Sequence, residues 1–431
     1  MISLCGVILA VILLVCLIYR RISLIPATLI CGILLVLTSK IPYIDLVMDH
    51  YATAMSGFIA KYFFVFVSNA LFGKIMEETL LVAVFSKMIT NIFGDRNAVF
   101  GAMLSTALLA YGGVSVFVIV FTVYPIFLST FKRADLPRKL IPACIMSSSC
   151  TFPLSMLPGS AQLNNIIPIQ YLNTTPMAAS FTGIVCSILT MGFLVLYFQF
   201  EFSKSRAKGE HFEADEGVRI RIMRFEQDSG IHSWMSVVPM VLIIVLINCF
   251  GMNLSYAVLA GALSAAVIGR KNLPQMWKTV NEGIGMVGPA MVTTAASVGF
   301  GGAVLACDGT RVILNAIASL PLSPMITLSI ASSFAGLMTG NGGGGADVAM
   351  NMLSSPYLAL GVRPEILHRI VAIATAGFSC LPHNGMLITI MDTCGYSSRE
   401  CYKYIFISTV IGSLIGLVLA NVAGGVIYPL G

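Results

Sequence analysis

Two ionisable residues, Asp347 and His383, lie inside long apolar stretches of the sequence. An acid inside a membrane segment is costly and usually functional, and histidine changes its charge near physiological pH. Both residue types therefore suit the coupling of a proton or a cation to transport. The alternatives are that Asp347 caps a helix N-terminus and that His383 makes fixed hydrogen bonds without a change of charge.

Small polar residues gather around the glycines and prolines that interrupt these apolar stretches. A helix that begins at such a break presents unpaired backbone N–H groups and about half a positive elementary charge, which together favour an anion. The predicted substrate-binding residues are Tyr111, Gly112, Gly113, Ser115, Ser148, Ser149, Thr151, Gly159, Ser160, Thr339, Gly340, Asn341, Gly342, Gly343, Ser379, His383 and Asn384. Ser147, Gln162 and Asn164 belong to the same polar group. Alternatively, a Ser or Thr hydroxyl in a membrane helix bonds a carbonyl one turn earlier.

Arg369, with His368 beside it, is a further basic residue near an apolar stretch. We expect it on the side of the membrane that carries few basic residues, where it would attract anions. The alternative is an arginine that faces the surface or is paired for structural reasons.

The sequence lacks the motifs of common enzymes. It has no His-Glu-x-x-His, no Gly-x-Ser-x-Gly and no Gly-x-x-x-x-Gly-Lys-Ser/Thr, and its 11 cysteines include no Cys-x-x-Cys pair. We therefore expect no catalytic residues, no metal and no cofactor. An integral-membrane enzyme that acts on lipid is the alternative class, but it would need a nucleophile, a base or a metal cluster.

Composition identifies the solvent of this chain as a lipid bilayer. Of 431 residues, 57% are hydrophobic and 10% are charged, and apolar runs long enough to cross a bilayer recur throughout. We expect spans at 2–19, 22–39, 57–76, 139–170, 177–200, 233–250, 254–269, 281–305, 366–395 and 403–428. The predicted fold class is an all-α polytopic membrane protein with about ten transmembrane helices and two re-entrant hairpins with broken helices.

The two halves repeat one order of elements. A glycine-interrupted stretch (98–131 or 323–361) precedes a broken apolar run (139–170 or 366–395) in each half. Each glycine-interrupted stretch is either a re-entrant hairpin or a pair of spans. Corresponding elements lie an odd number of crossings apart, which predicts an inverted-topology repeat of residues 1–200 and 233–431 joined by a linker at 201–232.

Charge sets the expected orientation. Most of the 25 Lys and Arg residues fall on one side of the predicted spans, and cytoplasmic loops collect such residues. We therefore expect the 201–232 linker in the cytoplasm, both termini outside, and a location in the inner (plasma) membrane. The net charge of +6 is not arranged as a basic stripe with aromatic residues, so we expect no nucleic-acid partner.

Five segments carry a family resemblance: Tyr111-Gly112-Gly113-Val114-Ser115-Val116-Phe117, Val123-Tyr124-Pro125, Leu157-Pro158-Gly159, Leu367-His368-Arg369 and Leu381-Pro382-His383-Asn384-Gly385. They resemble motifs of the GntP (gluconate permease) family in the ion transporter superfamily. The resemblance implies a proton-driven importer of sugar acids, with inverted repeats, a hairpin and a broken helix in each, and a homodimer of elevator type. The segments 341–347 and 381–385 depart from the gluconate permeases, which favours a branch with another substrate.

The expected function is thus proton-coupled symport of a small organic anion, namely a sugar acid such as gluconate or a related monocarboxylate. The expected partners are this anion, a proton or sodium ion, the lipid bilayer and a second copy of the chain. Sodium-coupled transport of a di- or tricarboxylate on the same scaffold is the alternative, because carbonyl groups at helix breaks also coordinate sodium.

Overall fold

We describe the chain from a computed structural model, which describes residues 2–20, 22–94, 97–114, 116–226, 230–273, 275–382 and 384–429. Regular structure within these ranges is helical, with no β-strand. Four continuous helical segments, 43–78, 180–207, 276–306 and 399–427, are long and apolar enough to cross a membrane, and shorter apolar helices accompany them. The chain is therefore an all-α polytopic membrane protein, as the composition predicted.

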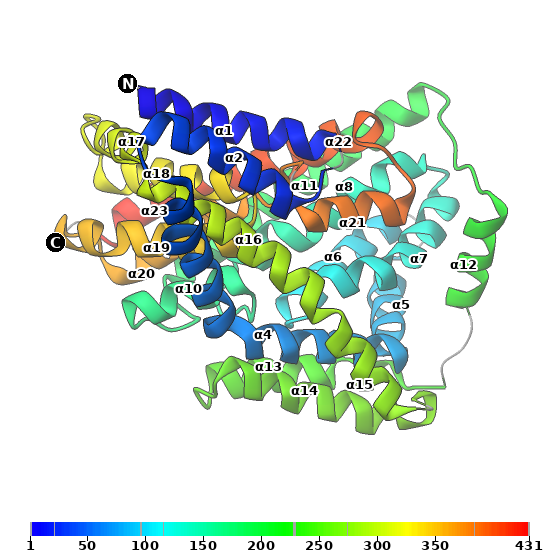
Figure 1. Cartoon of the computed structure of the whole chain (residues 1–431). Helices are drawn as coiled ribbons and strands as arrows, with labels where there is room; N and C mark the ends of the chain where they lie inside the picture. The colour runs from blue at the N-terminus through cyan, green and yellow to red at the C-terminus, as the bar shows by residue number, and fades with distance from the viewer. Residues whose placement is uncertain are drawn as a thin grey trace.

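One set of helices, here called the scaffold group, frames the molecule. It comprises α1 (Ile2–Tyr19), α2 (Leu24–Ser39), α3 (Tyr43–Asp45), the π-helical turn η1 (Leu46–Ala52), α4 (Thr53–Glu78), η4 (Ser233–Ser236), α13 (Val238–Asn248), α14 (Leu254–Ile268), η5 (Arg270–Asn272), α15 (Met276–Gly285), α16 (Val287–Ala306) and α17 (Asp308–Ala318). In Figure 1, α1 and α2 lie along the top, α13 and α14 along the bottom, and α16 runs diagonally between the two pairs. Helix α4 packs against α14, α15 and α16.

The remaining membrane helices form what we call the core group. It comprises α5 (Leu81–Phe93), α6 (Ala98–Tyr111), α7 (Val116–Ala134), η3 (Arg138–Leu140), α8 (Ile141–Cys150), α9 (Phe152–Ser155), α10 (Leu163–Leu172), α11 (Ser180–Ala207), α18 (Pro324–Thr339), α19 (Gly342–Ala359), α20 (Pro364–Ala376), α21 (Gly385–Cys394), α22 (Ser398–Phe406), η6 (Ile407–Ile411) and α23 (Gly412–Ile427). Helix α12 (Glu216–Glu226) lies in the linker between α11 and α13.

Two hairpins and two broken helices interlock at the centre of the core group. The first hairpin (α6–α7) packs against α8 and contacts α21 through α7, whereas the second hairpin (α18–α19) packs against α20 and contacts α10 through α19. Each broken helix thus gives its first half to one hairpin and its second half to the other. Two interlocked copies of one motif would produce this exchange, while the inverted relation of the two halves stays a prediction.

Helix α16 approaches its neighbours closely because it is rich in glycine. A Cβ added at Gly299 would lie 2.9 Å from the Tyr51 carbonyl oxygen, and one at Gly301 would lie 2.8 Å from Val348. Small residues of this kind let membrane helices pack at short distance. Glycine therefore sets how closely α16 contacts η1 on one side and the second hairpin on the other.

Three helices lie outside the spans expected from apolar length: α5, α12 and α17. Each is short; α5 and α17 are apolar mainly on one face, and α12 carries many charged residues, so a window that averages all residues does not detect them. In α12, which lies within the linker predicted at 201–232, Val218 and Ile222 are buried one turn apart. The span expected at 57–76 also begins earlier, at Tyr43.

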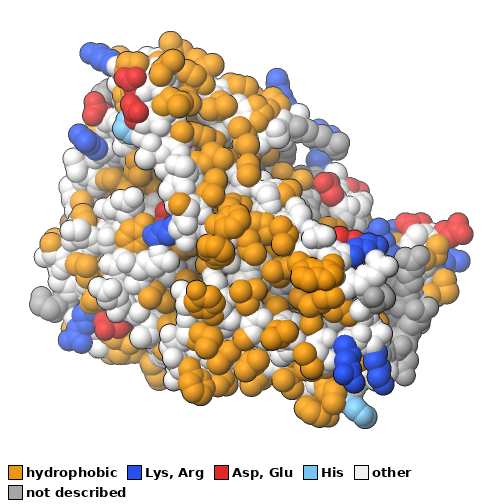
Figure 2. Space-filling model, turned by 60° about the horizontal axis from the view of Figure 1, so that its bottom comes forward, with side chains coloured by type: hydrophobic (Ala, Val, Ile, Leu, Met, Phe, Trp, Pro, Cys, Tyr) orange, Lys and Arg blue, Asp and Glu red, His pale blue; other side chains and the backbone are white. Residues whose placement is uncertain are grey.

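The surface agrees with a bilayer environment. Figure 2 shows a face on which hydrophobic side chains cover the middle and charged side chains lie mostly toward the margins. Large apolar side chains on several spans are exposed, among them Ile12, Leu196, Val418 and Val422. In water such a surface would be unfavourable, whereas lipid tails solvate it.

Candidate functional site

A cavity of about 130 Å³ lies between the core and scaffold groups, and we call it the tip cavity. Its lining comes from α4, the start of α7, the α15–α16 junction, α16, the second hairpin tip and both breaks. The lining residues are Val65, Phe66, Asn69, Ala70, Val116, Leu154, Gln162, Leu163, Asn164, Met286, Val287, Ala290, Thr294, Asn341, Gly342, Gly343, Ser379, Asn384 and Met386. None of these residues carries a formal charge. Any charge that enters the cavity must therefore be stabilised by dipoles and hydrogen bonds.

Four helix N-termini meet at the tip cavity. Helices α7, α10, α19 and α21 begin at Val116, Leu163, Gly342 and Gly385, and the cavity lining includes residues of the first turn of each helix or the residue that caps it. A helix N-terminus combines unpaired N–H groups with the positive end of the helix dipole. The cavity therefore collects positive potential from four helices without a lysine or arginine in its lining.

At the starts of α10 and α19, the backbone N–H groups of the lining residues Leu163, Asn164 and Gly343 have no partner in the described part of the chain. Their neighbours are satisfied, because the Gly342 N–H donates to Ser379 Oγ at 3.1 Å and the Gly344 N–H to Asn341 Oδ1 at 3.0 Å. Unpaired donors away from bulk water are costly unless a ligand or water accepts from them. They are suitable contacts for carboxylate oxygens.

The second hairpin turns sharply at Gly340, whose φ of 59° lies in the left-handed region that favours glycine. Asn341 then caps α19. Gly342 follows at a crowded point, since an added Cβ would lie 2.6 Å from Ser379 Oγ and 2.9 Å from Asn164 Nδ2. Only glycine lets the α19 N-terminus approach both breaks.

The second break is fixed by Asn384, the N-cap of α21. Its side-chain oxygen accepts from the Met386 N–H at 2.8 Å and the Leu387 N–H at 3.3 Å, and its side-chain nitrogen donates to the Gly340 carbonyl at 2.8 Å. One amide therefore ends the break and joins it to the second hairpin tip.

The first break is joined to the first hairpin in a similar way. The Gln162 side-chain nitrogen donates to the carbonyls of Ala110 and Val114, and the Tyr111 hydroxyl donates to the Pro158 carbonyl at 2.9 Å. Gly113 and Gly159 adopt positive φ angles of 93° and 77° at the two turns. The amides of Gln162 and Asn384 thus play matching parts at the two breaks.

The serines and threonine of the first break are used within helix α8 rather than at the cavity. Ser147, Ser148, Ser149 and Thr151 each donate to a carbonyl four residues earlier and are buried. Helix α8 continues to Cys150, so the break falls later than the run of serines. This is the back-bonded geometry that the sequence left open as an alternative.

The predicted binding residues therefore divide into several groups. Asn341, Gly342, Gly343, Ser379 and Asn384 line the tip cavity. Tyr111, Gly112, Gly113, Gly159, Ser160, Thr339 and Gly340 belong to the surrounding turns, and Ser148, Ser149 and Thr151 lie in or just after α8. Ser115 and His383 lie outside the described residues.

Sequence reasoning missed the scaffold wall of the cavity. Asn69 on α4 and Thr294 on α16 supply its polar atoms, and Phe66 and Met286 are among its apolar ones. A polar residue inside a long apolar span was the available signal for Asn69 and Thr294. The apolar residues gave none, because nothing in a sequence separates a cavity wall from lipid contact.

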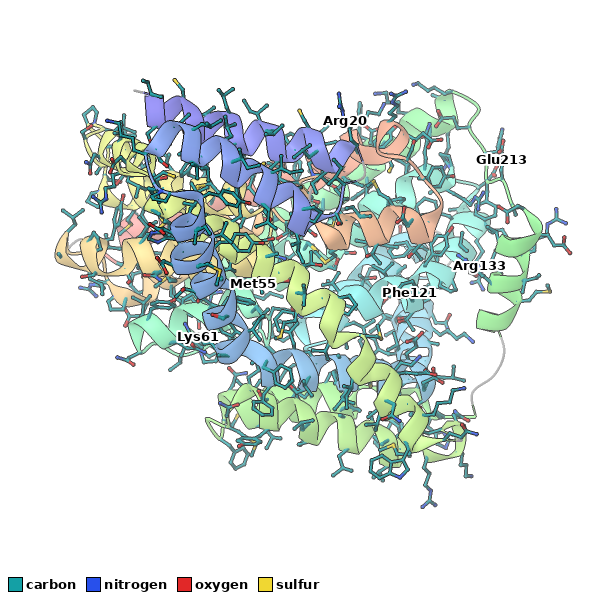
Figure 3. The ribbon with its side chains drawn as sticks, viewed as in Figure 1. Arg20, Met55, Lys61, Phe121, Arg133 and Glu213 are labelled. Atoms are coloured by element: carbon teal, nitrogen blue, oxygen red, sulfur yellow. The ribbon has the colours of Figure 1, made fainter. Side chains whose placement is uncertain are left out.

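Asp347 lies in a second cavity of about 590 Å³, which we call the side cavity; its polar lining includes Asp49, His50, Lys61, Tyr171 and Asn351. Asp347 Oδ1 accepts from the hydroxyls of Tyr62 and Tyr171, each at 3.0 Å, and lies 3.3 Å from Lys61 Nζ. Figure 3 labels Lys61 on α4. Asp347 is not the N-cap of α19, because Asn341 has that position.

The Lys61–Asp347 pair joins the scaffold group to the second hairpin. The Lys61 ammonium also lies 4.1 Å from the centre of the Tyr171 ring on α10. The lysine and aspartate side chains are 32% and 13% exposed, so solvent weakens the pair only in part. No group of three or more His, Cys, Asp or Glu residues in the described ranges has metal-binding geometry.

These features define a class: an integral membrane protein with interlocked hairpins and broken helices around a central cavity. No protein family model matches the chain. A crystal structure of the Alcanivorax borkumensis YdaH transporter, described as having an unusual topology, shares the fold with a TM-score of 0.58 over 88% of this chain and 89% of that one, at 15% identity.

A closer relative shows the family. The chain is 30% identical over 437 residues to the uncharacterized transporter YxjC of Bacillus subtilis (strain 168), covering 91% of this chain and 93% of that protein. The chain therefore belongs to the same family of transporters as YxjC.

Proposed function

We propose that this transporter carries a small organic anion, a sugar acid such as gluconate or a related monocarboxylate, by proton-coupled symport. The observation that carries the proposal is the convergence of four helix N-termini on the tip cavity. A monocarboxylate would accept from the unpaired N–H groups of Leu163, Asn164 and Gly343. The resemblance to the gluconate permeases supports the same substrate class.

Unpaired acceptors in the cavity favour a substrate that also carries hydroxyl groups. The side-chain oxygens of Asn69, Gln162 and Asn164 have no recorded donor, while their side-chain nitrogens donate to backbone or hydroxyl oxygens. Hydroxyl groups of a sugar acid would donate to these oxygens. A site built for such hydroxyls rejects an analogue without them, because its own polar groups would then stay unpaired.

The coupling proton is assigned to Asp347 in this proposal. Protonation would remove its ion pair with Lys61 and change how the second hairpin is held to α4. His383 is the second candidate for coupling. The transport motion in this proposal is a displacement of the core group against α4 and α16 of the scaffold group. The two halves form an inverted repeat, and the protein is a homodimer whose linker faces the cytoplasm.

Uptake by proteoliposomes tests the proposal. The purified protein is reconstituted without sodium, with acid outside, and given labelled gluconate, glycerate, lactate, butyrate and citrate in turn. The expected result is accumulation of one monocarboxylate that collapses on addition of a protonophore. No accumulation of any of them, with or without sodium, would contradict the proposal.

Sodium-coupled transport of a di- or tricarboxylate is the second candidate. The observation that favours it is the same set of unpaired amide oxygens in the tip cavity, because hard cations bind such oxygens. Accumulation of citrate that requires a sodium gradient and persists with the protonophore would replace the proton-coupled proposal.

A further inference from the structure

Arg369 of α20 is fully buried, and its guanidinium contacts one short segment of the chain. It donates to the Ser155 carbonyl at 2.9 Å, to Asn165 Oδ1 at 3.1 Å, and twice to the Ala178 carbonyl, at 2.6 and 3.2 Å. In the described ranges no carboxylate pairs with it. A buried charge without a counter-ion requires well-placed oxygens around it.

The segment that Arg369 holds contains the first break and the start of α10. Asn165 is its centre: the side-chain oxygen accepts from Arg369, and the side-chain nitrogen donates to the carbonyls of Ser160 and Pro176 at 2.9 and 3.0 Å. His368 adds two contacts, with Nε2 3.2 Å from Asn165 Oδ1 and Nδ1 2.8 Å from Thr174 Oγ1. The loop between residues 155 and 178 is thereby fastened to α20.

Asn164 connects this fastening to the tip cavity. It precedes Asn165, lines the cavity, and donates to Thr375 Oγ1 at 3.2 Å and to the Ala372 carbonyl at 3.4 Å, also on α20. One face of α20 therefore holds two consecutive residues of α10. A shift of this face would move the unpaired N–H groups of Leu163 and Asn164 out of the cavity.

We propose that Arg369 is a positioning residue that holds the α10 N-terminus at the tip cavity and places a buried positive charge behind it. The charge acts through a medium of low dielectric constant, where it is screened less than in water. The cavity therefore prefers an anion to a neutral solute of the same shape. This second part rests on the proposed function, because it takes the tip cavity as the anion site.

Lysine does not replace arginine in this role. The guanidinium is planar and reaches three oxygens at once with fixed donors, whereas an ammonium is a single point with three donors. Arg369→Lys keeps the charge and loses the simultaneous contacts, while Arg369→Gln loses both. The two variants separate positioning from charge.

Hydrogen exchange measured on the purified full-length protein tests positioning without any substrate. In Arg369→Gln we expect amides of residues 155–178 to exchange at least about tenfold faster than in the wild type, with little change at the 340–345 tip. The matched control is Arg363→Gln, because Arg363 is an exposed arginine at the N-terminus of the same helix. Equal exchange in the two variants would overturn the proposal.

Ligand-induced shifts of the unfolding temperature test the charge. The wild type is screened with gluconate, glycerate, lactate, butyrate and citrate, and the best carboxylate is compared with its neutral amide. We expect Arg369→Lys to lose affinity for the carboxylate and for the amide to the same extent, because the contacts are lost and the charge is kept. Arg369→Gln should also lose affinity for both, with a loss about tenfold larger for the carboxylate than for the amide. Equal losses for carboxylate and amide in Arg369→Gln would refute the charge effect.

Two further outcomes have a clear interpretation. If no carboxylate shifts the wild type, the proposed function fails at this cavity and the charge effect fails with it, while exchange still decides positioning. If Arg369→Gln does not fold, Arg369→Lys decides: faster exchange in residues 155–178 with a retained preference for the anion supports the proposal, and wild-type exchange overturns it.

Discussion

Gly342 is the residue at which the second hairpin tip comes closest to both breaks. Its missing side chain leaves room for Ser379 and Asn164, and an added Cβ would lie 2.6 Å from Ser379 Oγ. Because the neighbours are packed on both sides, the methyl group cannot be accommodated without moving the α19 N-terminus. Gly342→Ala should therefore abolish binding at the tip cavity rather than prevent folding.

This prediction is checked by uptake and by size-exclusion profiles. Gly192→Ala in α11 is the control, since an added Cβ there meets nothing within 4 Å. The control should transport as the wild type does. Transport by Gly342→Ala at the wild-type rate would show that the tip cavity is not the substrate site.

Asn384 has two roles that can be tested separately: it caps α21, and it donates to the Gly340 carbonyl of the second hairpin tip. Asn384→Asp can still cap α21, because aspartate is as good an N-cap as asparagine, but it cannot donate to the Gly340 carbonyl. It also adds a negative charge to a cavity proposed to bind anions. The expected result is a rise of at least about tenfold in the KM for the transported anion, corresponding to about 1.4 kcal/mol.

The control for this variant is Asn253→Asp. Asn253 also caps a helix, since its side chain accepts from the Ser255 N–H at 3.0 Å, but it lies at α14 and away from the tip cavity. Both variants should keep their folded state. An unchanged KM in Asn384→Asp would remove the second break from the binding site.

At the scale of elements, the Lys61–Asp347 pair ties α4 to α19 across the scaffold–core boundary. If Asp347 carries the coupling proton, Asp347→Asn holds it permanently in a neutral form. We then expect exchange of labelled substrate across the membrane to continue, while accumulation driven by a pH gradient is lost. Counterflow and gradient-driven uptake in the same proteoliposomes measure the two activities separately.

Lys61→Met distinguishes coupling from simple tethering. It breaks the same ion pair but leaves the carboxylate of Asp347 able to titrate. Accumulation driven by the pH gradient should survive in Lys61→Met at a reduced rate. Gradient-driven accumulation by Asp347→Asn would exclude Asp347 as the coupling residue.

The linker is held to the core group by three carboxylates, of which Asp135 and Asp215 are exposed and Glu210 is partly buried. The Phe212 N–H and His211 bond Asp135, and the Lys139 ammonium bonds Glu210. Asp215 accepts from Arg138 of the core group and from the Val218 N–H within the linker. These contacts lower the pKa of all three carboxyl groups. A lowered pKa in the folded state means that the contacts stabilise docking above the ordinary carboxyl pKa of about 4 and are lost as pH falls below it.

We therefore expect limited proteolysis within residues 208–232 to accelerate as pH falls from 5 toward about 3.5. The variant Asp135→Asn should show faster cleavage already at neutral pH, because its two contacts are weakened. Glu213→Gln is the control, since Glu213 is exposed and makes no hydrogen bond or ion pair with the described residues. Cleavage that does not depend on pH would mean that apolar contacts of Val218 and Ile222 alone dock the linker.

At the scale of the whole molecule, transport by displacement of the core group requires the α16–α19 contact to slide. An added Cβ at Gly301 would lie 2.8 Å from Val348 Cγ2, close enough for a cysteine pair to form a disulfide. The variant Gly301→Cys with Val348→Cys should lose transport on oxidation and regain it on reduction. The controls are the two single variants, Gly301→Cys and Val348→Cys, which should not respond to oxidation. Unimpaired transport by the oxidised double variant would contradict a sliding motion at this contact.

The sequence by itself determined the solvent, the helical class and the places where helices break. These follow from local chemistry: apolar length demands a bilayer, and glycine and proline interrupt helices, so that α18 ends at Thr339 before Gly340 and α20 ends at Ala376 before Gly377. Helices α5 and α17 were not predicted because only one face of each is apolar, and α12 was not predicted because it carries many charged residues. The inverted relation of the halves, the orientation and the substrate stay predictions.

Only the tertiary structure decided which polar residues face a common cavity. The serines of α8 and the amides of Gln162 and Asn164 are all polar residues near a helix break in the sequence. In the structure the serines donate to carbonyls of their own helix, whereas the two amides line the cavity. Partners such as Asp347 with Lys61, or Arg369 with Ser155, come from segments far apart in the chain. Such pairings depend on how whole helices pack, because the direction of a side chain is fixed by the helix that carries it and not by its neighbours in sequence.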